Sequence, residues 1–260
     1  MKHSFKTILI LVLFFLVAQL IGLVIVQLLT EKELAFGIQR PQLNKETSFI
    51  SIFLIILLVT GITLLIARFN AIRLWKVWFF ASIVLVLTIS LSAFVHQYIA
   101  LFFALIGAYF KVVKFNLIVH DFTELFIYGG LAALFVPVFS ILSISILLLL
   151  IAGYDAVAVW KTKHMIRLAK FQNKVKLFAG LLIPSGKKRM AILGGGDIGF
   201  PLLFTGVVIN ESGSRGLIIP FIVAISLFLL LYFGKEDRYY PAMPFLAAGC
   251  FIGYFLTFFI

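Results

Sequence analysis

Charged residues and cysteine are scarce in this sequence. Only 12% of its 260 residues are charged, and cysteine occurs once, at Cys250. A soluble domain carries about 25% charged residues. A chain that is 63% hydrophobic has too few polar residues to form a surface that faces water. A single cysteine excludes an intrachain disulfide and a cysteine metal cluster. The composition therefore predicts a protein that lies in a lipid bilayer.

Several catalytic motifs are also missing. No HExxH pattern is present, which argues against a zinc protease of that type. Ser214 falls in a short predicted outer loop without a nearby histidine, which argues against a serine protease. The histidines are scattered, and each is expected at a span boundary or in a loop: His3, His96, His120 and His164. The sequence thus predicts no metal site and no cofactor.

Apolar runs occupy most of the chain and indicate transmembrane helices, since a helix of about 20 apolar residues crosses the hydrocarbon core. The first run is too long for the apolar region of a signal peptide and is expected to be retained. Pro137 separates two runs that would otherwise form one implausibly long helix. The nine predicted spans are 7–29, 48–67, 77–95, 97–113, 117–136, 139–160, 190–209, 216–234 and 241–260. We therefore predict an all-α polytopic membrane protein with nine transmembrane helices.

The basic residues indicate how the spans are oriented. The net charge of +12 lies mostly in short loops between apolar runs, which is typical of membrane topology and not of nucleic-acid binding. With a cytoplasmic N-terminus, 18 of the 22 Lys and Arg residues fall on the inner side and four on the outer side. The longest inner loop is 161–189, and its basic stretch 161–176 is expected to lie on the anionic inner leaflet.

The chain shows no internal repeat and no soluble domain, so we predict a single integral membrane domain. We divide it into a five-span N-terminal scaffold, residues 1–138, and a catalytic region, residues 139–260, which contains the cytoplasmic loop 161–189. The expected location is the plasma membrane, with membrane lipids as surroundings and no nucleic-acid partner. Nothing in the sequence indicates obligate partner subunits.

Two acidic residues stand out among the ten in the chain. Only Asp155 and Asp197 sit deep inside predicted spans, where an isolated charge costs several kcal/mol. Asp121 and Glu124 are expected near an inner boundary, within reach of headgroups. At a helical rise of 1.5 Å per residue, Asp155 and Asp197 lie about 9 and about 12 Å from the inner boundary. Matching depths on consecutive antiparallel spans predict two carboxylates that face each other across a wet pocket.

Such a pair has a specific chemical use. Two close carboxyls cannot both ionise cheaply, so they share one proton. The ionised group can take a proton from water while the protonated group hydrogen-bonds a peptide carbonyl, which hydrolyses an amide without metal. Because the two protons are lost in coupled steps, neither role is assigned to one residue.

Two further segments accompany the aspartates. Gly194, Gly195 and Gly196 precede Asp197 and are expected to weaken the helix and to allow close backbone approach. The second segment is Pro241-Ala242-Met243, which Pro244 follows. Pro244 suits the first turn of a helix, so residues 241–243 are expected to stay unwound. Their free N–H and C=O groups could then pair with an extended peptide. A small-residue packing face and an ordinary helix start are the plainer interpretations.

Together these residues resemble presenilin and signal peptide peptidase, the GxGD intramembrane aspartyl proteases, and especially the compact presenilin-like proteins of archaea. Tyr154-Asp155 is similar to the family's YD, and Gly194-Gly195-Gly196-Asp197 to its GxGD. Pro241-Ala242-Met243 is similar to its PAL, with methionine where leucine is usual. The likeness is strong over residues 139–260, whereas the first five spans match only in number and orientation.

The resemblance implies a presenilin-like fold of nine spans with a water-filled cavity that opens inward. It implies an endopeptidase that cuts transmembrane helices of membrane proteins or peptide remnants. Asp155 and Asp197 would be catalytic, and substrate would contact Tyr154, the three glycines and residues 241–243. A prepilin-peptidase-like GxGD protease and a proton-coupled secondary transporter are the alternatives.

Overall fold

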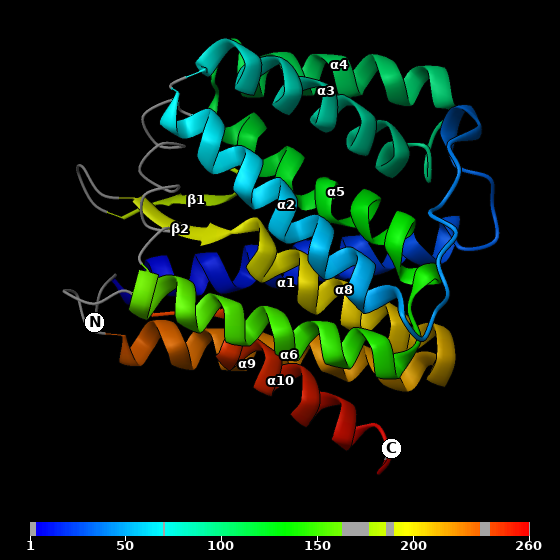
Figure 1. Ribbon diagram of the computed structural model, residues 1–260, viewed down its shortest axis with the longest axis vertical. Helices are drawn as coiled ribbons and strands as arrows, with labels where there is room; N and C mark the ends of the chain where they lie inside the picture. The colour runs from blue at the N-terminus through cyan, green and yellow to red at the C-terminus, as the bar shows by residue number, and fades with distance from the viewer. Residues whose placement is uncertain (1–3, 70, 163–176, 186–189, 235–239, 260) are drawn as a thin grey trace.

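The computed structural model describes residues 4–69, 71–162, 177–185, 190–234 and 240–259. Over these residues the protein is a bundle of helices that run roughly side by side, with a small β-hairpin at one end (Figure 1). The described N-terminal residues lie at that same end, and the C-terminal residues lie at the other (Figure 1). We call the first of these the hairpin end of the bundle.

Helices form because each apolar run must satisfy its backbone groups internally where no water is available. Local polar residues mark several helix starts: the Asn116 side chain accepts from the backbone N–H groups of Ile118 and Val119. Ser140 forms a capping box with Ser143. The helices are α1 (Phe5–Leu29), α2 (Ser48–Arg68), α3 (Ile72–Leu91), α4 (Gln97–Val112), α5 (Leu117–Phe135), α6 (Ile141–Val157), α8 (Gly195–Ser212), α9 (Ile219–Phe233) and α10 (Met243–Leu256).

Six helical segments within the described residues are long and apolar enough to cross a membrane. One of them, Gly195–Phe233, contains both α8 and α9, while α4 and α10 are apolar but shorter. The chain is therefore a multi-pass membrane protein. The count of nine spans and the cytoplasmic N-terminus stay predictions. The predicted surface-lying stretch 161–176 falls almost wholly outside the described residues.

The expectation of a purely helical chain was wrong at residues 180–184 and 190–194. Strand β1 (Gly180–Pro184) pairs antiparallel with strand β2 (Met190–Gly194), with Gly180 opposite Gly194 and Pro184 opposite Met190. The predicted span 190–209 therefore begins as a strand, and α8 starts only at Gly195. An apolar run of five residues fits a strand as well as a helix, so hydrophobicity alone could not decide between them.

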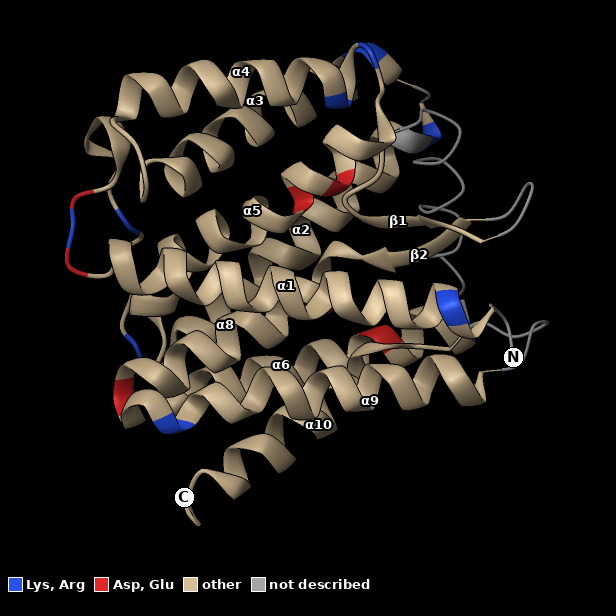
Figure 2. Ribbon diagram, turned by 180° about the vertical axis from the view of Figure 1, so that it is seen from behind, with Lys and Arg blue, Asp and Glu red and all other residues tan. Residues whose placement is uncertain are grey.

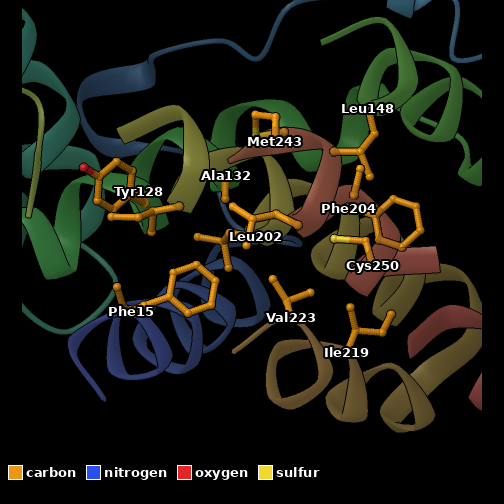
Figure 3. Packing of buried hydrophobic residues seen from close by; sticks show 14 of the residues in the cluster. Phe15, Tyr128, Ala132, Leu148, Leu202, Phe204, Ile219, Val223, Met243 and Cys250 are labelled. Atoms are coloured by element: carbon orange, nitrogen blue, oxygen red, sulfur yellow. The ribbon is translucent and has the colours of Figure 1, made fainter. Parts of the chain in front are cut away.

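The core of the bundle is built from α1, α5, α6, α8, α9 and α10. Figure 3 shows side chains from this cluster, among them Phe15, Leu202, Phe204 and Val223, packed against one another. Helices α1 and α5 approach closely where Gly22 meets Gly129: a Cβ on Gly129 would lie only 3.1 Å from the Cα of Gly22. Small residues at such contacts are typical of helix packing in membranes. The division of the chain at residue 138 stays a prediction.

The interior holds more charge than the sequence predicted. Lys111 and Glu124 are each 1% exposed and form an ion pair between α4 and α5, and Asp121 is 7% exposed. The expected placement of Asp121 and Glu124 at headgroups was therefore wrong. His120 is also buried, at 1% exposure, although it lies in the first turn of α5. Figure 2 shows the acidic positions of α5 inside the bundle beside α4. Such groups tolerate burial only when they are paired.

Candidate active site

Asp155 lies near the end of α6, where the helix passes directly into a π-helical turn, Ala158–Thr162. Its carboxylate is half-buried and accepts a hydrogen bond of 3.1 Å from the backbone N–H of Met243, at the start of α10. Helices α6 and α10 are therefore joined at this carboxylate. π-helical turns are rare and occur frequently at functional sites.

Asp197 lies in the first turn of α8. Gly194 is the N-cap residue of this helix, and its backbone N–H is directed at the Asp197 carboxylate. An acidic side chain in the first helical turn is favourable, because the N-terminal end of a helix carries partial positive charge. The side chain is only partly buried, so Asp197 is held by its backbone surroundings without being sealed from the site.

The two carboxylates are brought together by the contact of α6 with α8. They interact electrostatically, and their role as a pair stays a prediction. The assumption of a helix from residue 189 onward, on which the depth of Asp197 was estimated, was wrong. Residues 190–194 form a strand, which rises about 3.3 Å per residue instead of 1.5 Å. Among the described residues, neither carboxylate forms an ion pair with a basic side chain.

The segment Pro241-Ala242-Met243 lies beside Asp155 but is less unwound than predicted. Met243 is already the first residue of α10, and Ala242 caps the helix in a helical conformation. The Ala242 carbonyl accepts from the N–H groups of Phe245 and Leu246, both at 3.1 Å. Because the Met243 N–H donates to Asp155, these groups do not offer the free pairing edge that we expected. In this structure they hold the carboxylate instead.

The three glycines differ in their surroundings. The prediction that they weaken the interior of a helix was wrong, because Gly194 ends β2 while Gly195 and Gly196 open α8. A Cβ on Gly195 would lie 3.0 Å from the hydroxyl oxygen of Tyr128 and 3.3 Å from the carbonyl oxygen of Ala179, which is tighter than ordinary contact. Gly196 is exposed, and a Cβ there would meet only Phe200, at 3.5 Å. Close backbone approach therefore applies to Gly195.

Tyr154 precedes Asp155 and is oriented by α2. Its side chain hydrogen-bonds to Thr60, so the tyrosine connects α6 with the otherwise loosely packed α2. Most of α2 is exposed on the outside of the bundle, as expected for a helix in contact with lipid. Tyr154 therefore lies at the contact between α6 and α2, and its contact with substrate stays a prediction.

Strand β2 presents an open edge near Asp197, which the sequence did not reveal. The N–H of Leu182 donates to Asp121, at 3.0 Å, so it points away from β2. Pairs in an antiparallel ladder alternate in direction, and Ile192, opposite Leu182, therefore points its N–H and C=O away from β1. Ile192 is 41% exposed. Figure 1 shows β2 on the α6 side of the hairpin. A sequence signal existed, since Pro184, Ser185 and Gly186 separate two short apolar runs.

Comparison with known families settles the class of protein. The family model described as signal-peptide peptidase, presenilin aspartyl protease matches residues 12–195. This range covers more than half of the chain. The chain belongs to this family of aspartyl proteases. The matched range includes Asp155 and ends two residues before Asp197, so it contains one member of the candidate pair.

Solved structures of presenilin-family proteins share this fold. Two structures of a presenilin family intramembrane aspartate protease, in space groups C222 and P2, each align with a TM-score of 0.67 and 23% sequence identity. The first alignment covers 96% of this chain and 98% of the solved chain, and the second covers 95% of each. At this identity the likeness shows the fold. A search of curated proteins gave no match.

Family membership confirms several predictions from the sequence. This presenilin-family protein is an aspartic endopeptidase of the intramembrane-cleaving class and an integral multi-pass membrane protein. The prepilin-peptidase and transporter interpretations are therefore set aside. Within the part of the chain that the structure describes, no three His, Cys, Asp or Glu side chains are grouped closely enough to hold a metal ion.

Proposed function

We propose that this protease cleaves transmembrane helices inside the membrane, with Asp155 and Asp197 as its catalytic pair. The observation that carries the proposal is the meeting of two partly exposed carboxylates, from α6 and α8, that interact with each other and are held by backbone N–H groups. The other interacting acids, Asp121 and Glu124, are fully buried beside Lys111 and could not receive a substrate.

The pair can hydrolyse a peptide bond with water alone. The ionised carboxylate accepts a proton from water as the water oxygen attacks the carbonyl carbon, while the protonated carboxyl donates to the carbonyl oxygen. When the tetrahedral intermediate collapses, the carboxyl group that took the water proton gives it to the amide nitrogen, the other carboxylate takes back a hydroxyl proton, and the C–N bond breaks. The products are a new carboxyl group and a new amine. The mechanism treats the two aspartates as one unit, because their protonation is coupled.

A substrate must be extended at the cut bond, since a helix hides its carbonyls in internal hydrogen bonds. The outward edge of β2 suits such a segment, because an extended peptide can add to an open strand edge. Ile192 and Gly194 both point their backbone groups away from β1, and the N–H of Gly194 faces Asp197. A peptide paired at Ile192 would therefore lead directly to the carboxylates.

The finer assignments of substrate contact and location are part of the same proposal. Tyr154 and the three glycines 194–196 directly precede the two aspartates along the chain, and Pro241 lies two residues before Met243, whose N–H binds Asp155. These residues are proposed to contact substrate. Ala242 and Met243 are proposed to act through the Asp155 carboxylate that the Met243 N–H binds. The hairpin end is proposed to face the cytoplasm in a nine-span arrangement, and the plasma membrane is the proposed location.

Cleavage of a model peptide tests the proposed function. The purified protein in detergent is expected to cut a single-span transmembrane peptide into two products. Their masses should place the cut inside the apolar span. If the peptide stays intact across several model sequences, or if only bonds outside the span are cut, intramembrane cleavage by this chain is refuted.

A proline at the β2 edge tests the proposed pairing with substrate. Ile192→Pro removes an N–H that points away from β1, so the hairpin should survive, since proline is tolerated at strand edges. Loss of one hydrogen bond to substrate, worth about 1 kcal/mol, should lower kcat/KM about fivefold, mainly through KM. The matched control is Met190→Pro, which alters the same edge farther from Asp197 and should change kcat/KM less than twofold. Equal effects of the two prolines would contradict pairing at Ile192.

A further inference from the structure

Helix α5 carries a polar face that points into the protein. His120, Asp121, Glu124 and Tyr128 follow the spacing i, i+1, i+4 and i+8, which places them on one side of a helix. All four are buried, with exposed fractions between 1% and 7%. Neither the catalytic pair nor the proposed substrate edge uses any of them. We call this set, together with Lys111 of α4, the α5 network.

One half of the network covers the outer edge of β1. The Nε2 of His120 hydrogen-bonds to the carbonyl oxygen of Gly180 at 2.9 Å. The Asp121 carboxylate accepts from the N–H of Leu182 at 3.0 Å. These two side chains occupy the positions that a third strand would take, so the hairpin is fastened to α5 along β1. Only the β2 edge is then left for another peptide.

The other half of the network reaches the start of α8. Lys111 forms an ion pair with Glu124, and the Tyr128 hydroxyl donates to the second oxygen of the same carboxylate. Figure 3 shows the Tyr128 ring at the border of the core, with its hydroxyl pointing away from Leu202. The phenol lies against Gly195, where an added Cβ would be 3.0 Å from its oxygen, and it interacts electrostatically with Asp197.

The two halves therefore hold both ends of the segment that leads to Asp197. The described chain is bonded to α5 at Gly180 and Leu182 of β1, and it is packed against α5 again at Gly195, the first residue of α8. Stability alone gives no reason for this arrangement, because a buried ion pair is often no more stabilising than apolar residues of similar volume. The need to hold a catalytic group in place does give a reason for the arrangement, since a misplacement of about 1 Å can cost about 100-fold in rate.

We propose that the α5 network is a positioning device that fixes Asp197 and the hairpin relative to Asp155. The inference rests on the proposed function, because it concerns the same carboxylate pair. None of the network residues touches substrate or the reacting atoms. Their contribution is to rate and to the choice of the bond that is cut.

Removal of the charges in pairs separates positioning from stability. The double variant Lys111→Met/Glu124→Leu leaves no unpaired charge, so its Tm should stay within about 5 °C of wild type. Tyr128 loses its anchor in this variant, and Tyr128→Phe loses the same bond directly. Both proteins should show kcat lowered about tenfold, with KM within about twofold, because substrate binding at β2 is unchanged.

The bond between Asp121 and the Leu182 N–H is tested by a different measurement, the position of the cut in the substrate. Asp121→Leu leaves the Leu182 N–H without its acceptor, so the hairpin can shift against α5. Mass spectrometry of the products should then show cleavage spread over neighbouring peptide bonds. Asp121→Asn retains an oxygen that accepts from the same N–H and should restore a single main cut.

A destabilised variant outside the network serves as the control. Ile89→Val shortens a fully buried side chain in the cluster of Ile25 and Leu29, so it lowers Tm without removing any polar group of the network. Its kcat and its cut position should remain those of wild type. The inference is overturned if the double variant and Tyr128→Phe keep full kcat, or if Ile89→Val reproduces their effects. Failure of the wild type to cleave would instead refute the proposed function, so the two failures are distinguishable.

Discussion

Asp155→Asn and Asp197→Asn are each expected to abolish cleavage of a transmembrane peptide. Asparagine keeps the size of the side chain but can neither accept the proton of the attacking water nor supply a carboxyl proton. A positioned acid or base contributes about 100-fold to 10,000-fold in rate. Because the two carboxyls act as one unit, loss of either should cost most of the total effect. The measurement is the initial rate of product formation at saturating peptide.

Two controls separate lost chemistry from lost folding. The Tm of each variant should not fall, because a carboxylate in this setting serves chemistry and not stability. Glu46→Gln makes the same carboxylate-to-amide change at an exposed position in the loop before α2 and should leave the rate unaltered. If either aspartate variant retained more than about 5% of the wild-type rate, the assignment of that residue would be wrong.

Lys111→Met alone is expected to destabilise the fold strongly. Methionine fills the space of the aliphatic stem, but Glu124 is left 1% exposed without its counter-charge. Breaking a buried pair by removing one partner typically costs about 3–5 kcal/mol. Unfolding in a chaotrope series, in a fixed detergent, measures the loss.

A second substitution, at Glu124, shows whether the lost stability comes from the unpaired charge. Adding Glu124→Leu to Lys111→Met should restore most of the stability, because no unpaired charge remains. Lys114→Met, at an exposed lysine only three residues away, should alter stability by less than about 0.5 kcal/mol. A double variant as unstable as Lys111→Met would show that packing, and not charge, accounts for the loss.

The family could be predicted from the sequence because its signals are local. An aspartate within an apolar run is conspicuous wherever it occurs, and Asp155 and Asp197 were chosen this way as the proposed catalytic pair. The start of α10 was also predicted to within one or two residues, since prolines at 241 and 244 restrict where a helix can begin. What the Met243 N–H would do could not be predicted, because its acceptor lies 88 residues earlier in the chain.

The hairpin and the buried charges were missed for different reasons. Residues 190–194 are too few for periodicity to distinguish strand from helix. Glu124 was assigned to a boundary because it lies near a predicted span end, and no pattern in either helix alone shows that Lys111 and Glu124 pair across α4 and α5. The spacing of His120, Asp121, Glu124 and Tyr128 on one face of a predicted span could have indicated an inward polar face.

Binding of a transition-state mimic tests the central claim most directly, because it requires no turnover. In a suitable peptide analogue, a hydroxyl-bearing tetrahedral carbon takes the place of the attacked carbonyl carbon, so that its hydroxyl stands where the attacking water would lie between the two aspartates. Its dissociation constant should be at least about 100-fold higher for Asp155→Asn and for Asp197→Asn than for the wild-type protein. Wild-type affinity in either variant would show that the mimic does not sit between these two carboxylates, and Asp155 and Asp197 would then not form one catalytic site.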